Sequence, residues 1–338
     1  MTVTRRLVLA GGAAASALYA TPHLASAFSA PEPVIWRGQA LGAPAKIILY
    51  HPDQHRADRL IRNCVREASR FEDIFSLYKQ DSELSRLNRA GALAAPSPEL
   101  IDLLSICRTC WELSDGLFDP TVQPLWDCLK QHFSQPSADP AGPSQAVWDK
   151  ALTKVGFGRV LFDDNRIVFA KPSMALTLNG IAQGYISDQV ADLLRSEGVE
   201  HALVDMGEYR ALGGQPDGKP WRIGISRLEA TSKVEAFIDI VDQGLATSSF
   251  AGFQFEKSGQ FNHLLNPKTG YSASLYEYLT VVSRDAARAD AWATAFNLME
   301  EQDISATLQS QPDMAVFARR RDGEHFTLNA PAIIPVSF

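Results

Sequence analysis

The sequence predicts an α+β fold with mainly antiparallel sheets flanked by helices. Segments with alternating apolar and polar residues lie close together along the chain and are separated by short turn sequences, which favours hairpins. Helical patterns, with apolar residues every three or four positions, interrupt these strands in groups instead of following each strand in turn. A parallel, doubly wound sheet needs that regular alternation, so the pattern indicates antiparallel pairing.

Composition narrows the class of protein further. The 338 residues are 46% hydrophobic and 21% charged, as in an ordinary globular protein, so a disordered chain is excluded. The formal net charge is −7, whereas a nucleic-acid-binding protein needs a basic face. No apolar run is long enough to span a bilayer. We therefore expect no nucleic-acid partner and no membrane span.

The N-terminal segment has the features of an export signal. Arg5 and Arg6 precede a run of small apolar residues, and Ala25-Ser26-Ala27 matches a cleavage site. The paired arginines resemble those of a twin-arginine signal. A helix with two capping arginines is the structural alternative, but the segment has no acidic residue. We expect residues 1–27 to be a twin-arginine-type signal peptide, and residues 28–338 to fold as one domain in the periplasm.

The first predicted helix follows a strand over residues 45–50. Asp53 is a suitable N-cap, and the apolar residues after it recur at intervals of three and four, so one face of this helix is expected to be buried. A loop rich in Ser and Asp is expected over residues 75–88. Ser97-Pro98 is typical of the start of the next helix, which is expected to stop at Gly116.

The rest of the chain alternates between turns, strands and helices. Residues 163–166 form a turn sequence between two strand patterns and predict a hairpin. Gly198 ends a helical pattern, since glycine is common just after a helix. The expected elements are a loop over 134–144, a helix over 145–155, strands over 159–162, 167–170 and 174–178, a helix over 181–197, strands over 202–205, 221–226, 234–241, 253–257, 261–265 and 279–283, a helix over 286–299, and strands over 314–318 and 325–328.

Four cysteines raise the question of a redox or metal site. Cys107 and Cys110 form a C-x-x-C pair, but the pair lies inside a helical pattern and does not follow a strand at the start of a helix. One close pair among four cysteines is also a poor zinc pattern. We therefore favour small buried thiols over a thioredoxin-like site.

Two segments place small or polar residues where a core does not need them. Asp119, in Leu117-Phe118-Asp119-Pro120-Thr121, suits either a turn cap or a ligand contact. The segment from Thr177 to Gly184 joins a strand to a helix through small residues. Such a junction exposes backbone N–H groups to a ligand, although close helix packing explains its glycines equally well. It lacks the G-x-G-x-x-G pattern of dinucleotide-binding folds.

Two further segments carry side chains suited to catalysis. His263 lies beside a turn sequence and suits general-base chemistry at neutral pH, although a single histidine is more often structural. Asp290 and Thr294 are four residues apart on a predicted helix and therefore share a face. Their oxygens suit Mg²⁺, but helix-dipole complementarity and a backbone-bonded hydroxyl account for the two residues more simply when they are taken alone.

Together, in this order and spacing, the segments resemble the ApbE family of FAD:protein FMN transferases, and the resemblance covers most of the chain after the signal. It implies an ApbE-like domain over residues 28–338 with antiparallel sheets flanked by helices. The motifs that carry it are Leu41-Gly42, Phe75 to Tyr78, Ser82 to Leu84 with Asn88, Gly116 to Thr121, Gly180 to Tyr185, Ala246 to Ser248, His263 to Gly270 and Ala289 to Thr294.

The resemblance implies a reaction and a set of site residues. FAD would bind with Mg²⁺, its pyrophosphate would be cleaved, FMN would be joined through phosphate to a Thr or Ser hydroxyl of a client protein, and AMP would leave. Asp290, Thr294 and the backbone carbonyl of Gly180 would hold Mg²⁺, and His263 would be the base. The residues implied to contact FAD are Leu41, Tyr78, Leu117, Phe118, Asp119, Thr177 and Gln183.

The chain also departs from the family pattern. Where the family usually has a carboxylate and a lysine, this sequence has the neutral residues Thr177 and Gln183. This loss of charge motivates a non-catalytic FAD-binding carrier or assembly factor as one alternative, and a FAD pyrophosphatase that releases free FMN is another. With the export signal, the variant pattern resembles the NosX branch of the family, which is associated with nitrous-oxide reduction. Its implied client is the membrane flavoprotein NosR.

Overall fold

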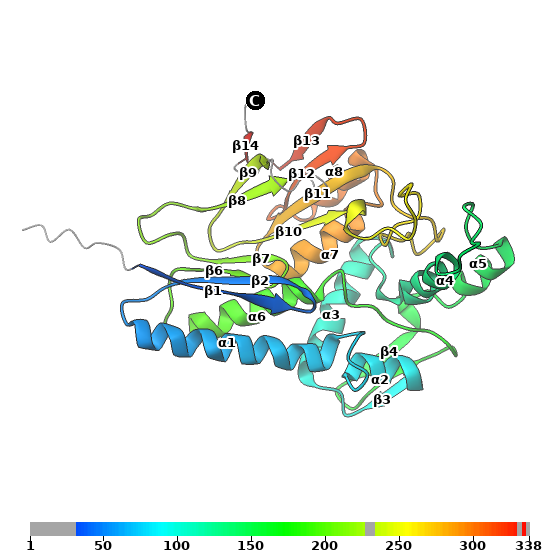
Figure 1. Cartoon of the computed structure of the whole chain (residues 1–338), viewed down its shortest axis with the longest axis horizontal. Coiled ribbons are helices and arrows are strands. Elements are labelled where there is room, and N and C mark those ends of the chain that lie inside the picture. The colour runs from blue at the N-terminus through cyan, green and yellow to red at the C-terminus, as the bar shows by residue number, and fades with distance from the viewer. Residues whose placement is uncertain (1–31, 227–233, 330–332, 336–338) are drawn as a thin grey trace, which may run out of the picture. The chain divides into compact units, whose positions relative to one another are not determined.

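The computed structural model describes residues 32–226, 234–329 and 333–335. The expected signal peptide, residues 1–27, lies outside the described residues. Within them, no helix is both long and apolar enough to cross a membrane. The described strands form three sheets, and each strand pairing in those sheets is antiparallel, which confirms the predicted fold class (Figure 1).

The largest sheet has eight strands in the order β1-β2-β6-β7-β10-β11-β12-β13 (Figure 1). β1 and β2 form a hairpin in which Pro33 lies opposite Tyr50. β10 lies inside the sheet between β7 and β11, so segments far apart in the sequence become neighbours. The strands are β1 Pro33–Ala40, β2 Ala43–Tyr50, β6 Ala202–Asp205, β7 Tyr209–Leu212, β10 Gly244–Ser249, β11 Tyr276–Ser283, β12 Ala315–Arg320 and β13 His325–Leu328.

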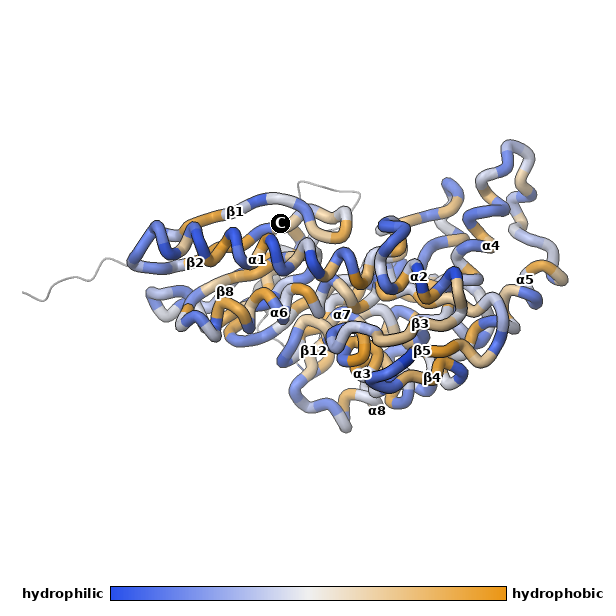
Figure 2. Tube along the Cα trace, turned by 90° about the horizontal axis from the view of Figure 1, so that it is seen from below, coloured by the Kyte–Doolittle hydropathy of each residue, from blue (hydrophilic) through white to orange (hydrophobic). Residues whose placement is uncertain are grey.

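Three helices cover one face of this sheet: α1 (Gln54–Phe75), α6 (Ala182–Ser196) and α7 (Ala286–Phe296). α1 begins at its predicted cap, because the Asp53 carboxylate accepts a hydrogen bond from the backbone N–H of Arg56 at 3.0 Å. Hydrophilic and hydrophobic turns alternate along α1 in Figure 2, as in a helix with one buried face. α6 and α7 pack against each other as well as against the sheet, so the residues between them are held closely.

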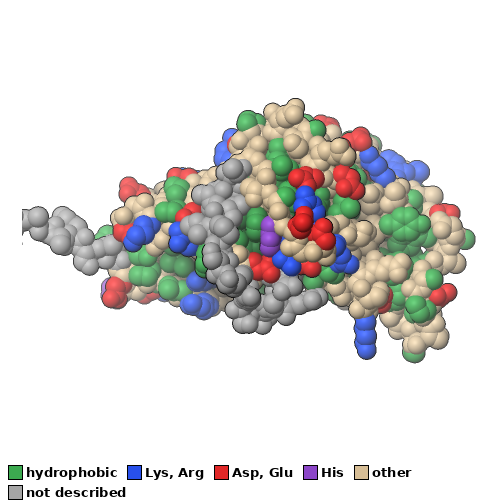
Figure 3. All heavy atoms as spheres, turned by 90° about the horizontal axis from the view of Figure 1, so that it is seen from above, with side chains coloured by type: hydrophobic (Ala, Val, Ile, Leu, Met, Phe, Trp, Pro, Cys, Tyr) green, Lys and Arg blue, Asp and Glu red, His purple; other side chains and the backbone are tan. Residues whose placement is uncertain are grey.

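A smaller sheet of β8 (Trp221–Ser226), β9 (Val234–Ile240) and β14 (Ile333–Pro335) packs on the opposite face. Ile223 and Ile238 of this sheet share one apolar cluster with Val282 of β11. Polar and charged groups near the cluster pair with one another: the Tyr278 hydroxyl donates to Glu235 at 2.9 Å, and the Arg319 guanidinium lies 2.6 Å from the Glu277 carboxylate. Figure 3 shows acidic and basic side chains gathered beside a histidine on this side of the molecule.

The third sheet and five further helices complete the described chain. The sheet has the order β3-β5-β4. α4 and α5 pack with a long loop through Leu129, Trp148 and Phe261, which forms a separate small core. These elements are β3 Ala92–Ala94, β4 Val160–Asp163, β5 Arg166–Phe169, α2 Glu83–Ala90, α3 Pro98–Leu113, α4 Gln123–Phe133, α5 Gln145–Leu152 and α8 Glu301–Gln309.

The strand predicted over residues 174–178 is wrong, because a side chain takes the place of a neighbouring strand. The Asn88 amide accepts from the backbone N–H of Leu176 and donates to the carbonyl of Leu176, both at 2.8 Å. These two bonds satisfy the backbone without a ladder. Residue 88 itself lies in α2, so the loop predicted over 75–88 is also wrong after Ser82, which caps that helix.

Four other predicted elements are wrong in extent, and one of them is the helix predicted over 145–155, which ends at Leu152. The strands predicted over 253–257 and 261–265 are represented only by isolated bridges, such as the one between Gln254 and Asn262. The buried side chain of Asn262 donates to the carbonyl of Ala273 at 2.9 Å, so the loop is held by side chains instead of a sheet. The helix predicted over 286–299 ends at Phe296, three residues early.

The cysteines are free thiols. Cys107 and Cys110 are buried on one face of α3, and Cys64 is buried on α1. Burial raises the pKa of the Cys64 and Cys110 thiols to about 12, so neither forms the thiolate that redox or metal chemistry needs. This agrees with the interpretation of the C-x-x-C pair as core residues.

Candidate functional site

One cavity collects the four segments that the sequence singled out. It lies where the start of α6, one face of α7 and the loop after α3 meet, and the loop that carries His263 closes another side. Every predicted site residue except Leu41 and Tyr78 lines it. Those residues are Leu117, Phe118, Asp119, Thr177, Gly180, Gln183, His263, Asp290 and Thr294.

The two exceptions lie elsewhere. Tyr78 is 75% exposed and lines a neighbouring hollow that shares Trp126 and Asn179 with the cavity, so the two spaces adjoin. Leu41 packs against the main core, and its backbone N–H donates to Glu72 at 2.7 Å. Leu41 therefore lines neither space, whereas Tyr78 lies at the edge of the second.

Glycines let the two helices of the site approach each other. A Cβ atom on Gly180 would lie 2.8 Å from the hydroxyl oxygen of Thr294, and one on Gly184 would lie 2.3 Å from the carbonyl oxygen of Ala286. Both separations are shorter than a carbon atom allows. The small residues at the start of α6 therefore serve close packing, and the same packing brings the Gly180 backbone next to the α7 side chains.

Asp290 and Thr294 lie one turn apart on α7 and both line the cavity, as predicted. The Asp290 carboxylate accepts a hydrogen bond from the backbone N–H of Gly184 at 3.3 Å. Burial raises the pKa of Asp290 to about 7, and the nearby Asp188 carboxylate adds to the shift, against the opposing effect of the Gly184 bond. A carboxylate in this position is poorly compensated unless a cation lies beside it.

Glu208 is a cavity residue to which the sequence analysis assigned no role. It lies in the turn between β6 and β7, lines the cavity and accepts a hydrogen bond from the backbone N–H of Thr247 at 3.2 Å. Burial, and then the charge of Asp290, hold the pKa of Glu208 well above its ordinary value. The available signal was an acidic residue directly after a glycine at a strand end, which is weak by itself.

The charge balance of the cavity is one-sided. Asp119, Glu208 and Asp290 contribute carboxyl groups, and no Lys or Arg is present among the described residues that line it. The Asp290 carboxylate, the Thr294 hydroxyl and the adjoining Gly180 backbone supply the oxygen ligands that Mg²⁺ prefers. The residues of this cavity therefore fit a divalent cation.

Asp188 fixes the helix that carries these groups. Its carboxylate accepts hydrogen bonds from the backbone N–H groups of Ala286 and Ala287, at 2.9 and 2.8 Å, and so caps the start of α7 from α6. The guanidinium of Arg210 lies 3.1 Å away and pairs with the same carboxylate. Burial raises the pKa of Asp188 to about 7, but these partners compensate its charge.

The environment of His263 leaves one ring nitrogen available. Its Nδ1 lies 3.1 Å from the carbonyl oxygen of Phe253, which can only accept, so this nitrogen carries the proton in the neutral ring. Nε2 is then the free acceptor. Burial lowers the pKa of His263, against a smaller opposing effect of the Phe253 bond, so the ring is neutral at neutral pH.

Asp119 is held by the backbone and a neighbouring side chain. It caps a short 3₁₀ helix, where one oxygen accepts from the N–H of Thr121 at 2.7 Å and the other accepts from the N–H of Phe157 at 2.9 Å. The cap alternative is therefore present in the structure. A ligand contact through Asp119 stays a prediction, as do those of the other implied FAD contacts.

Known proteins resemble the chain in sequence and in fold. A family model described as the ApbE family matches residues 41–318. An FAD:protein FMN transferase of Haemophilus influenzae is 31% identical over 72% of this chain and 72% of its own length, and one of Salmonella typhimurium is 26% identical over 96% and 95%.

Solved structures give the same result. The flavin transferase ApbE of Vibrio cholerae is 27% identical and superposes with a TM-score of 0.74, covering 88% of this chain and 97% of its own. The ApbE protein of Thermotoga maritima is 26% identical with a TM-score of 0.76, over 87% and 96%. The likeness therefore extends over nearly the whole described fold.

Proposed function

We propose that this chain, which belongs to the ApbE family and is a flavin transferase, uses Mg²⁺ to transfer FMN from FAD to a client protein. In this reaction a Thr or Ser hydroxyl oxygen of the client bonds to the phosphorus of the FMN half. The bond between that phosphorus and the bridging oxygen of the pyrophosphate breaks, and AMP leaves with the bridging oxygen. The proton of the attacking hydroxyl goes to a base of the enzyme.

One observation carries this proposal: the cavity that unites the predicted residues contains three carboxyl groups and no Lys or Arg among its described lining residues. The pyrophosphate of FAD is itself anionic, so the cavity offers it no side-chain cation and repels it wherever these carboxyl groups are ionised. Asp290, Thr294 and the carbonyl of Gly180 would hold Mg²⁺, which supplies charge neutralisation and Lewis-acid polarisation of the pyrophosphate when bound. The fold of this chain holds these ligands together, and Asp290 is buried among them.

His263 is the proposed base. Its Nε2 is the unprotonated nitrogen because Nδ1 faces the Phe253 carbonyl. The lowered pKa of His263 keeps that nitrogen ready to accept a proton at neutral pH. The ring lines the same cavity as Asp290, so base and cation ligand act on one bound substrate.

The location and the client are proposed from the sequence. The paired Arg5-Arg6 and the Ala25-Ser26-Ala27 site support export to the periplasm by the twin-arginine route. The NosX-like pattern supports a NosR-type membrane flavoprotein of nitrous-oxide reduction as the client. A mixture of the protein, FAD, Mg²⁺ and this client is expected to yield a client with covalent FMN and one equivalent of AMP.

Two alternatives give different products in the same mixture. The neutral residues Thr177 and Gln183 line the cavity and favour the alternative of a carrier, which would bind FAD without releasing AMP. A pyrophosphatase would release free FMN and AMP in the absence of any client. An unchanged client mass, under conditions in which another family member labels that client, would contradict transfer.

A further inference from the structure

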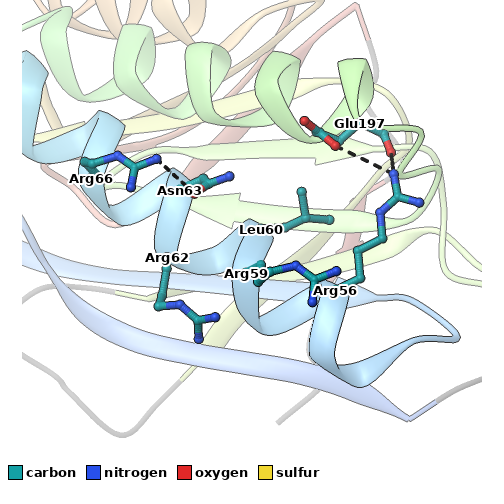
Figure 4. Close-up of a pocket in the computed structure, with 7 residues that line it drawn as sticks. All are labelled: Arg56, Arg59, Leu60, Arg62, Asn63, Arg66 and Glu197. Carbon is teal, nitrogen blue, oxygen red and sulfur yellow. Dashed lines mark hydrogen bonds and ion pairs between the residues drawn. The ribbon is translucent and has the colours of Figure 1, made fainter.

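A row of arginines lies on the exposed side of α1, in a part of the molecule that the proposed reaction does not use. Arg56, Arg59, Arg62 and Arg66, here called the arginine face, are all exposed and line one hollow with Asn63, Leu60 and Glu197 (Figure 4). At a helical rise of about 1.5 Å per residue, the row extends over about 15 Å. It concentrates positive charge on a chain whose net charge is −7.

The charges of this face are largely uncompensated. Arg56 donates to the carbonyl of Glu197 at 2.9 Å and lies 3.6 Å from its carboxylate, and Arg66 donates to the neutral amide of Asn63. No hydrogen bond or ion pair joins Arg59 or Arg62 to a described residue, although the Asp53 carboxylate at the start of α1 interacts electrostatically with Arg59. Among the residues drawn in Figure 4, no dashed line reaches Arg59 or Arg62. A stabilising role in the fold does not explain two such guanidinium groups.

The arginine face is separate from the flavin cavity. Gln183, at the start of α6, lines the flavin cavity, whereas Glu197, just beyond the end of α6, lines the arginine hollow. The two ends of this helix are about 20 Å apart at a rise of about 1.5 Å per residue. The arginines therefore do not belong to the residues that surround the proposed metal ligands.

The position of the face is related to the entry of the chain into the fold. Residue 33 begins β1 and pairs with Tyr50 at the end of β2, and Asp53 starts α1 three residues later. The first described strand and the first described helix therefore begin at the same end of the molecule, which is the end where the arginine face begins.

We propose that the arginine face binds the anionic headgroups of a phospholipid membrane. The hollow has one apolar side chain, Leu60, and it is only 3% exposed. A protein partner is normally anchored by Trp, Tyr or Arg side chains in well-packed pockets, whereas this hollow has no aromatic side chain among its described lining residues and its arginines are all exposed. A planar anionic surface needs only a row of cations, and guanidinium groups bind phosphate oxygens through paired hydrogen bonds. Bound through this face, the protein presents positive charge to the membrane although its net charge is −7.

The test is co-sedimentation of the full chain with two kinds of vesicle, phosphatidylcholine alone and phosphatidylcholine mixed with phosphatidylglycerol. The neutral vesicles measure any contribution of the N-terminal apolar run, which is the same in all variants. Wild type is expected to bind the anionic vesicles more strongly, with a difference that disappears at high salt. The triple variant Arg59→Glu, Arg62→Glu, Arg66→Glu is expected to lose that difference, by about a hundredfold in partition coefficient.

A matched control changes the charge equally elsewhere. Arg86→Glu on α2, Arg166→Glu at the start of β5 and Lys171→Glu just after β5 alter three exposed cations, and we expect anionic vesicle binding within about threefold of wild type. Equal losses in the two triple variants would overturn the proposal, as would equal binding of wild type to both vesicles. If the α1 variant bound anionic vesicles normally but lost FMN transfer to the client, the face would serve a protein and the membrane assignment would be wrong. Bound FAD in each variant verifies that the fold is retained.

Discussion

Gly180 lies directly against Thr294: a Cβ atom at residue 180 would be 2.8 Å from the Thr294 hydroxyl oxygen. The absence of a side chain at residue 180, in the turn just before α6, thus decides where the hydroxyl on α7 can be. Both groups are proposed ligands of one cation, so the contact that packs the start of α6 against α7 also sets the positions of two proposed ligands.

Gly180→Ala is therefore expected to displace the Thr294 hydroxyl and lower Mg²⁺-dependent FMN transfer at least tenfold, since loss of a metal contact commonly costs this much affinity. The measurement is the transfer rate over a range of Mg²⁺ concentrations. The double variant Gly180→Ala, Thr294→Ser keeps an oxygen on a side chain that has room to turn, and should recover part of the rate. A single variant with normal Mg²⁺ dependence would show that Gly180 is not at the cation.

Asp290 makes the stability of the metal-free protein depend on pH. Its pKa is about 7 in the folded chain against 3.8 for an ordinary aspartate, so folding takes up a proton between these values. Stability is then fully present at low pH and falls as pH rises toward about 7. Asp188 shifts in the same direction and contributes the same sign.

We expect the melting temperature in EDTA to be lower at about pH 8 than at about pH 5, and Mg²⁺ to raise it mainly at the higher pH. Asp290→Asn should melt higher than wild type at pH 8 in EDTA, gain nothing from Mg²⁺ and lose FMN transfer. A Mg²⁺ effect that survives in this variant would place the cation elsewhere.

Glu208→Gln is expected to raise the Mg²⁺ concentration needed for half-maximal transfer by about tenfold, because it removes a buried carboxyl group whose ionised form the proposed cation would stabilise. Gln still accepts the Thr247 N–H bond, so the fold should be unaffected. Glu324→Gln, an exposed acidic residue on the turn before β13, serves as the control and should not change the Mg²⁺ requirement.

His263→Ala is expected to slow transfer by about a hundredfold or more while FAD binding is retained, since general-base catalysis contributes rate and not ground-state affinity. In wild type the pKa of His263 is lowered from 6.5, so its ring stays neutral from neutral pH down to about 6.5. The transfer rate should therefore be constant over that range and should decrease at lower pH, where the ring becomes protonated. A stopped reaction analysed by client mass measures both effects. An unchanged rate in the variant would make His263 a structural residue.

Asp188→Ala should destabilise the fold by about 3–5 kcal/mol, because the buried guanidinium of Arg210 and two N–H groups of α7 lose their partner. Urea denaturation of the metal-free protein measures this. Asp192→Ala removes a carboxylate that pairs with Arg195 on the exposed side of the same helix and should leave the midpoint nearly unchanged. Similar effects of the two changes would contradict the capping role.

Local pattern predicted the strongly amphipathic elements. The helix after Asp53 and the helix that ends before Gly198 both form, because their apolar stripes are long enough to be recognised without knowing what covers them. Pattern did not predict β10, whose strand includes Thr247 and Ser248: short central strands are stabilised by their neighbours more than by their own composition.

The residues of the site also divide into those that the sequence predicts and those that only the fold brings together. The sequence named Asp290, Thr294 and His263 through side-chain chemistry and family resemblance, and the fold brings all three to one cavity. It assigned no role to Glu208, since only the pairing of β6 with β7 and the packing of α7 bring that carboxyl group near Asp290. Leu41, which the resemblance groups with the FAD contacts, packs against the core outside this cavity, and its contact with FAD stays a prediction.

Residue types and their periodicity along the chain are enough to predict the fold class, the family and the kinds of groups available for chemistry. Tertiary structure alone decided which groups share a cavity and which charges stay uncompensated. The cavity has three carboxyl groups and no lysine or arginine among its described lining residues, and the arginine hollow lies about 20 Å from it along α6. Both arrangements depend on distance and burial in the folded chain. Distances between segments remote in sequence arise only when the chain packs.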